Sequence, residues 1–253
     1  MAEVRAHSPL TLRPVHPPKV EKRAIKPSIA RHVNIRVNDP LDHDAPAILH
    51  EPRSYNFNES KGSAVVLVSG AGGGVSGPGS IYPSIADKLA LLLGIPSIRL
   101  DCRRPARTEY CSADIVASFT YLREHFNSTT FVLIGWSFGG SPCFTVAAQD
   151  DRVRGVATVA SQTANTVGIK KFEEYGNTGP REIRLLPGDD HGLTRHSTEV
   201  EKMIFEFAAK TLGFEKLLDQ SSDQAGEDLV ESRDERIREM VEGHDLEGDE
   251  RLQ

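Results

Sequence analysis

The sequence is poor in cysteine, with only three in 253 residues and no C-x-x-C pair among them (Cys102, Cys111 and Cys143). A count this sparse and odd argues against a disulfide scaffold and is typical of a reducing compartment, so we expect a cytoplasmic protein. No apolar run approaches the roughly 18 residues that a membrane-spanning helix needs, and the N-terminus lacks the apolar core of a secretory signal. We therefore expect no membrane-spanning segment.

Positive charge is outnumbered by negative charge, with 30 Lys and Arg against 36 Asp and Glu and a net charge of −6 at pH 7. The overall acidity gives no electrostatic footprint for nucleic acid, so we expect no such partner. The charge is unevenly spread: residues 1–30 carry +4, residues 31–213 carry −1 and residues 214–253 carry −9. We predict a basic, proline-rich flexible arm at 1–30, a folded domain at 31–213 and an acidic, disordered tail at 214–253.

The predicted tail contains one apolar pattern with two interpretations. Five apolar residues fall on one arc of a helical wheel: Leu229, Val230, Ile237, Met240 and Val241. They indicate an amphipathic helix that docks on the body or on a partner, or a solvated helix in a disordered tail. The polar composition around them favours the second interpretation.

The central part of the chain combines short apolar runs with helical patterns. Runs typical of strands are His32–Val37, Ala47–Tyr55, Ala64–Val68, Ile95–Leu100, Phe131–Ile134, Val153–Ala160 and Ile183–Leu186. Helical spacing of apolar residues predicts helices at Tyr82–Leu93, Ser112–Phe126, Ser137–Ala147 and Ser197–Leu212. From residue 63 on, strands and helices alternate, which predicts an α/β fold with a doubly wound, mostly parallel sheet and helices on both faces.

The sharpest motif is a serine flanked by glycines. Gly135-Trp136-Ser137-Phe138-Gly139 matches the G-x-S-x-G pattern at the point where a predicted strand meets a predicted helix. A nucleophile on such a tight turn needs both glycines, because larger side chains would collide with the strand and the helix. The helix that follows points its N-terminus at the site and favours negative charge there. The pattern predicts that Ser137 is a nucleophile; the alternative is a glycine-rich turn with an incidental serine.

A loop with six glycines, residues 69–79, follows the strand predicted at Ala64–Val68. In an acyl-transfer enzyme such a loop donates a backbone N–H to the developing oxyanion, and the residue after the nucleophile donates another. We expect Ala71 or Gly72 to be the first donor and Phe138 to be the second.

The same loop has a second interpretation. Residues 72–77 fit G-x-G-x-x-G, and Asp101 closes the next predicted strand, as in dinucleotide-binding folds. A lone match in a segment so rich in glycine is a weak signal, so we expect no cofactor and keep a dinucleotide-binding oxidoreductase as an alternative. No Gly-Lys-Ser/Thr follows the loop, which excludes a P-loop.

A histidine follows the last predicted strand, in the stretch Leu185–Gly192. A general base lies in this place at the carboxyl edge of a parallel sheet, and the order serine before histidine fits. We therefore expect His191 to take the proton of Ser137, with His196 on the same loop as a rival. A metal site is a further alternative, but adjacent carboxylates usually point apart, so we expect no metal at Asp189, Asp190, His191 and His196.

Taken together, these motifs resemble the α/β-hydrolase superfamily, in particular its small, lidless serine hydrolases. The matching stretches cover most of residues 63–213: Val65–Gly79, Ser97–Arg104, Phe131–Gly140, Val153–Gln162 and Ile183–His191. The resemblance implies a doubly wound sheet, a Ser137 nucleophile, a His191 base and an oxyanion hole at Ala71 and Phe138. It also implies hydrolysis of carboxylic esters or related acyl compounds, with a small-molecule acyl substrate as the partner.

The chain departs from this family where the third triad residue, an Asp or Glu, is expected. Only 22 residues, 161–182, separate the strands predicted to end at Ala160 and to begin at Ile183. A strand–helix–strand crossover alone needs a dozen or more residues, and no second apolar run lies in this segment. We therefore expect one strand unit of the family pattern, and with it the usual acid, to be missing.

Three interpretations of the missing acid stay open. Glu173 or Glu174 serves instead, a Ser–His dyad operates alone, or the segment is truly absent through a deletion or a gene-model error. Asp189 and Asp190 are too close to His191 in sequence to reach its Nδ1 easily. The sequence thus predicts a serine hydrolase, with a non-catalytic or degenerate hydrolase-fold protein as the alternative, and it leaves the oligomeric state open.

Overall fold

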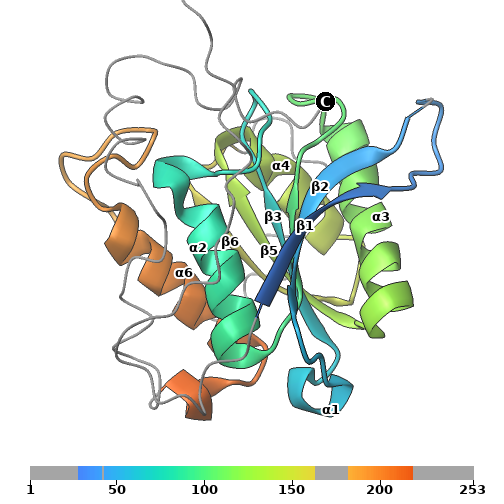
Figure 1. The fold of residues 1–253 in the computed structure, drawn as a ribbon. Helices are drawn as coiled ribbons and strands as arrows, with labels where there is room; N and C mark the ends of the chain where they lie inside the picture. The colour runs from blue at the N-terminus through green and yellow to red at the C-terminus, as the bar shows by residue number, and fades with distance from the viewer. Residues whose placement is uncertain (1–27, 42, 163–181, 219–253) are drawn as a thin grey trace, which may run out of the picture.

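The computed structural model describes residues 28–41, 43–162 and 182–218. These residues form a six-stranded sheet with the strand order β1-β2-β4-β3-β5-β6 (Figure 1). The strands are β1 (Ser28–Ile35), β2 (Ala45–Pro52), β3 (Ser63–Val68), β4 (Ser97–Leu100), β5 (Thr130–Trp136) and β6 (Val153–Val159). The first 27 residues and the acidic tail from 219 on lie outside the described part.

Strands β3 to β6 run parallel to one another, as their continuous apolar runs predict. Every residue of β3 is buried, because helices cover both faces of the sheet. β1 and β2 form an antiparallel hairpin, and β2 joins the sheet through an antiparallel ladder that pairs Ala47 with Leu100. The carboxyl ends of the parallel strands meet at one edge, which is where ligands bind in open α/β sheets.

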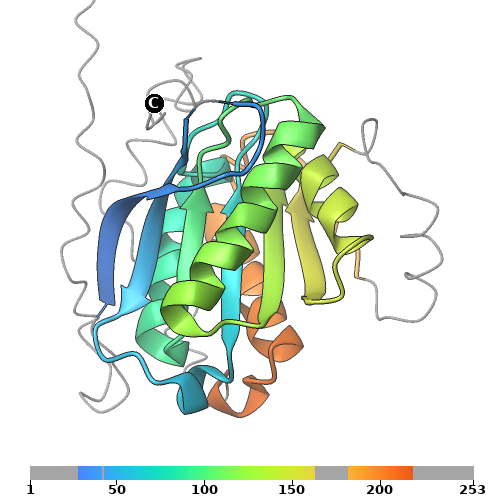
Figure 2. The same cartoon turned by 90° about the vertical axis from the view of Figure 1, so that its right-hand side faces the viewer.

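Helices lie on both faces of this sheet (Figure 2). They are α1 (Phe57–Ser60), α2 (Ile81–Lys88), α3 (Thr108–Phe126), α4 (Gly140–Ala147) and α6 (Ser197–Thr211), with shorter helical turns η1 (Pro78–Ser80), η2 (Leu89–Leu93) and η3 (Ser137–Gly139). Helices α2 and α6 pack on one face, and α3 and α4 pack on the other. Within the described ranges, no helix is both long and apolar enough to cross a bilayer.

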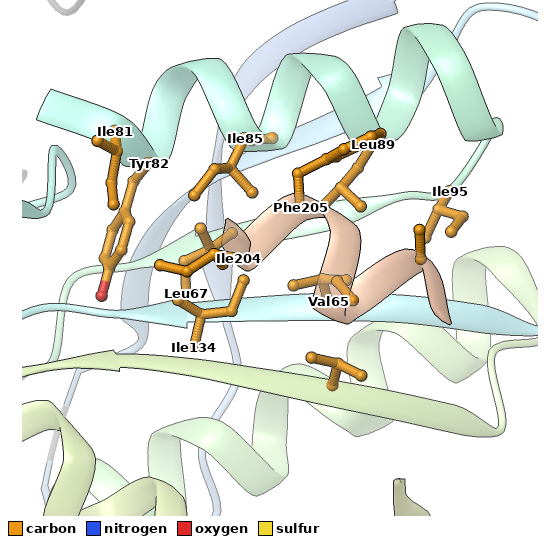
Figure 3. Close-up of a cluster of buried hydrophobic side chains, with 14 of the residues drawn as sticks. Val65, Leu67, Ile81, Tyr82, Ile85, Leu89, Ile95, Ile134, Ile204 and Phe205 are labelled. Atoms are coloured by element: carbon orange, nitrogen blue, oxygen red, sulfur yellow. The ribbon is translucent and has the colours of Figure 1, made fainter. Parts of the chain in front are cut away.

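Alternate residues of β3 divide the interior into two hydrophobic clusters. Val65 and Leu67 face the first cluster, together with Phe205 of α6 (Figure 3). Val66 faces the second, together with Phe119 of α3. Burial of each such side chain stabilises the fold by about 1.5–3 kcal/mol. The second cluster also holds three buried cysteines, none of which forms a disulfide: Cys102, Cys111 and Cys143.

The predicted fold class is confirmed, and the element boundaries shift by a few residues. α3 begins at Thr108 rather than at the predicted Ser112. β1 begins at Ser28, within the segment predicted to be an arm. At the other end, Phe214 and Leu218 are buried in the first cluster, so the packed body continues a few residues past 213.

The strand predicted at Ile183–Leu186 is wrong. The structure has no strand there, and Ile183 and Leu185 are 84% and 85% exposed. Only Leu186 packs against the first cluster. The physical reason is that a strand needs a ladder partner, and among the described residues β6 pairs with β5 alone. An apolar run by itself does not supply the missing hydrogen bonds.

Candidate active site

Ser137 sits on a tight turn between the end of β5 and the start of α4, at the carboxyl edge of the sheet. Its φ is 51°, in the left-handed region that residues other than glycine rarely adopt. A Cβ at position 135 would lie 2.7 Å from the carbonyl oxygen of Gly139, and one at position 139 would lie 2.4 Å from that of Ser69. Both flanking glycines of the predicted motif are therefore required by close backbone approach.

His191 lies beside this serine. Its Nε2 is 2.8 Å from Ser137 Oγ, a hydrogen-bond distance, although 54 residues separate the two in sequence. The Ser137 residue is only 5% exposed, whereas His191 lies on the surface. The geometry lets an unprotonated Nε2 accept the serine proton, and an exposed imidazole can exchange that proton with solvent.

Trp136, the residue before the serine, holds the histidine loop. Its indole Nε1 donates a hydrogen bond to the backbone carbonyl of His191 at 3.0 Å. The two rings lie 5.9 Å apart, tilted by 34°. One turn of backbone therefore presents the serine and also anchors the histidine that contacts it. Sequence reasoning missed this role of Trp136, since a tryptophan at this position of the motif gives no signal of its own.

The rival histidine, His196, has a different role. Its Nδ1 lies 3.0 Å from Asp189 Oδ2, and Asp189 also accepts hydrogen bonds from the backbone N–H groups of Asp190, Arg195 and His196 at 2.9–3.1 Å. Burial alone would raise the pKa of Asp189, but these donors together hold it below the ordinary value. Asp189 thus closes the loop that carries His191, and it does not act on His191 itself.

No carboxylate of the described residues contacts the second ring nitrogen of His191. Glu182 pairs with Arg184 on the surface. The two candidate acids Glu173 and Glu174 lie outside the described residues. The described part of the chain therefore brings together a serine–histidine pair and no third member.

The glycine loop approaches the serine from β3. Gly73 N–H donates to the Gly70 carbonyl at 3.2 Å, which closes a tight turn with Ala71 and Gly72 at its exposed tip. The other predicted donor, Phe138, follows Ser137 at the start of η3. Because position 139 touches the carbonyl of Ser69, the loop and the serine turn pack directly together.

The structure bears on two alternatives. The carboxylate of Asp101, which a dinucleotide site would turn toward a ribose, is buried and accepts the Gly74 N–H at 3.0 Å. The residues that the structure describes contain no group of three His, Cys, Asp or Glu side chains arranged to hold a metal ion. Asp101 thus binds the protein's own backbone, and the candidate metal ligands are not grouped around a common point.

The strand order, the tight serine turn and the histidine loop define a doubly wound α/β protein of the hydrolase type. A family model described as alpha/beta hydrolase fold matches residues 64–194. The chain therefore belongs to the α/β-hydrolase superfamily. No curated protein matched the chain.

Solved structures share this fold at low sequence identity. A dienelactone hydrolase from Anabaena variabilis is 14% identical, with 71% of this chain and 96% of that chain covered and a TM-score of 0.54. Est1E from Butyrivibrio proteoclasticus is 14% identical, with 72% and 100% covered and a TM-score of 0.54. At identities this low, the structural similarity shows a common fold and nothing more.

Proposed function

We propose that the chain is a serine hydrolase that cleaves a carboxylic ester or a related small acyl compound through an acyl-enzyme on Ser137. One observation carries the proposal: His191 Nε2 lies 2.8 Å from the Oγ of a serine whose backbone is held at a positive φ. A strained serine on such a turn, in contact with an imidazole, is the arrangement that activates a hydroxyl for attack.

In the proposed mechanism His191 Nε2 removes the Ser137 proton while Oγ attacks the acyl carbon. The oxyanion that forms accepts hydrogen bonds from the N–H groups of Ala71 and Phe138. Collapse of this intermediate expels the alcohol, which takes the proton from His191, and leaves the acyl group on Oγ. Water then attacks the ester with His191 again as base, and the acid leaves from a regenerated Ser137.

Turnover requires His191 to act in one of two ways. It works in a triad with Glu173 or Glu174 as the acid, or in a dyad with Ser137 alone. In serine proteases, replacing the triad aspartate by asparagine lowers kcat about 10⁴-fold without abolishing catalysis, since the oxyanion hole still acts. A dyad enzyme is therefore slow but measurable. Glu173→Gln and Glu174→Gln separate the two cases, because only the residue that serves as acid lowers kcat.

A fluorophosphonate probe tests the nucleophile. We expect the wild-type chain to be labelled at Ser137 and Ser137→Ala to remain unlabelled, while Ser141→Ala, one helical turn further on, is labelled as well as wild type. Labelling of Ser137→Ala at the wild-type level would refute the assignment.

A second candidate function is a non-catalytic or degenerate member of the superfamily. The absence of a carboxylate partner for His191 among the described residues favours it. This candidate predicts no turnover of a panel of p-nitrophenyl esters and no labelling, although the chain shows a cooperative melt. Hydrolysis that disappears in Ser137→Ala eliminates it.

A further inference from the structure

The glycine loop has an exposed tip and a buried stem. Ala71 and Gly72 are exposed, whereas every residue from Gly73 to Ser80 is buried. Gly73 and Gly74 have φ values of 82° and 86°, which only glycine adopts without strain. Such a stem has great conformational freedom in the unfolded chain, so its single folded path must be fixed by contacts from outside the loop.

Two side chains from the end of β4 make those contacts. Asp101 Oδ1 accepts the N–H of Gly74 at 3.0 Å, and Arg99 Nη1 donates to the carbonyl of Val75 at 3.0 Å. Both side chains are buried, with Arg99 1% exposed. Residues two apart at the end of a strand point to the same side, so this pair binds two consecutive residues of the stem, one through its N–H and the other through its carbonyl.

The contacts of Arg99 extend to the N-terminal hairpin. Arg99 Nε donates to His50 Nε2 at 3.0 Å, so that nitrogen is unprotonated and the ring proton lies on Nδ1. Nδ1 then donates to Asp87 Oδ1 at 2.9 Å. Burial lowers the pKa of His50, and the hydrogen bond that His50 donates to Asp87 opposes this shift only in part, which agrees with a neutral ring. Arg99 is thereby held in one orientation by groups from β2 and α2.

We propose that Arg99 and Asp101 are positioning residues for the oxyanion hole: by fixing Gly74 and Val75 they fix the adjoining turn that carries Ala71. This inference rests on the proposed hydrolase function. An oxyanion donor must lie within about 2.7–3.1 Å of a charge that exists only in the transition state, and losing one donor costs about 10²–10³ in kcat. Loosening the stem displaces such a donor without removing it.

The test compares three variants with the wild-type chain on p-nitrophenyl acetate. Asp101→Ala removes the acceptor of Gly74, and we expect kcat to fall at least about 10-fold, with KM changing less than about twofold. Asp101→Asn keeps an oxygen that accepts the same N–H, so it should restore kcat to within about threefold of wild type. Arg99→Lys can reach Val75 or His50 but not both, and it should lower kcat in the same way; it carries the test if Asp101→Ala does not fold.

Asp150→Ala is the matched control. Asp150 accepts the backbone N–H of Arg152 at 3.0 Å, as Asp101 does for Gly74, but it lies at the opposite edge of the sheet, before β6. We expect it to lower the melting temperature and leave kcat unchanged. A transition-state analogue adds an independent readout: the Ki of a trifluoromethyl ketone should rise by the same factor as kcat/KM falls in Asp101→Ala.

The possible failures are distinct. If the wild-type chain neither hydrolyses the ester nor reacts with a fluorophosphonate, the proposed function is overturned and the positioning role with it. If the wild-type chain is active and folded Asp101→Ala keeps kcat within about twofold, only the positioning role is overturned. An equal fall of kcat in Asp150→Ala overturns it as well, because the effect would then follow general stability.

Discussion

Ser137 is held in its strained conformation by contacts on both sides of the turn. Its carbonyl accepts the N–H of Gln162 at 3.0 Å, so the segment after β6 braces the residue from the neighbouring strand. A non-glycine residue at positive φ costs of the order of 1–3 kcal/mol of stability, and the conformation persists only where surrounding contacts hold it in place. The neighbouring strand and the close glycine contacts supply that constraint.

Trp136 gives a prediction at the same scale. Trp136→Phe keeps an aromatic ring but loses the indole N–H that binds the His191 carbonyl at 3.0 Å. We expect kcat to fall about 10-fold while KM changes little, because displacing the proposed base affects the reaction step more than substrate binding. Steady-state kinetics with a p-nitrophenyl ester check this, and a thermal melt serves as the control for folding. Unchanged kcat would show that the histidine loop holds its place without the indole.

Asp189 predicts a pH effect on stability. Its pKa is lowered in the folded state, so its stabilisation is fully present above the unfolded pKa of about 3.9 and is lost as pH falls through the folded pKa. Asp189→Asn should destabilise the fold by about 1–3 kcal/mol at pH 7, since four donors lose a charged acceptor. The difference from wild type should shrink as the pH falls below 4. Urea unfolding at pH 7 and pH 3 measures both values, and equal differences at the two pH values would contradict the assignment.

Helix α6 docks through a narrow apolar stripe, with Val200, Ile204 and Phe205 in the first cluster. Phe205 is fully buried, so Phe205→Ala should destabilise the fold by about 3–5 kcal/mol through lost burial and a cavity. Lys210→Ala, at an exposed position of the same helix, should change stability by less than about 0.5 kcal/mol. Chemical denaturation measures both, and similar losses in the two variants would show that α6 is not docked as described.

Residues 183–186 do not form the strand that the sequence predicts, and a substitution in this segment tests that finding. Leu185 is 85% exposed, so Leu185→Ser should change the unfolding free energy by less than about 0.5 kcal/mol. If the segment formed a buried strand, as its sequence suggests, the same change would cost at least about 2 kcal/mol. Urea denaturation distinguishes the two values.

Local patterns predicted most elements and the centre of the candidate site. The serine turn could be predicted because all five residues of its motif are consecutive, and the glycine loop because one strand leads into it. The contacts of Trp136 with His191 and of Asp189 with His196 could not, because each depends on where a loop returns in space. The strand at Ile183–Leu186 failed for the same reason, since strand formation depends on a neighbour that a single segment does not reveal.

At the scale of the whole molecule, the N-terminal hairpin is structurally part of the same sheet. The family match begins at residue 64, after β1 and β2. Nevertheless β2 contributes His50, which reaches the glycine loop through Arg99. Helix α6 is tied in from the other end of the chain, because Glu201 pairs with Lys88 of α2 in the interior. Segments outside the family match thus make buried polar contacts with residues inside it.

The reactivity of the three buried cysteines reports whether the domain is folded. Burial raises the pKa of Cys143, and the hydrogen bond with Cys111 together with burial raises that of Cys102, so neither thiol forms a reactive thiolate in the native state. We expect Ellman's reagent to react slowly with the native chain and rapidly with all three cysteines in guanidinium chloride. Full reaction within seconds in native buffer would contradict the burial of this cluster. Otherwise the rate at which Ellman's reagent reacts in native buffer measures how often the domain opens, and neither a substitution nor a substrate is needed.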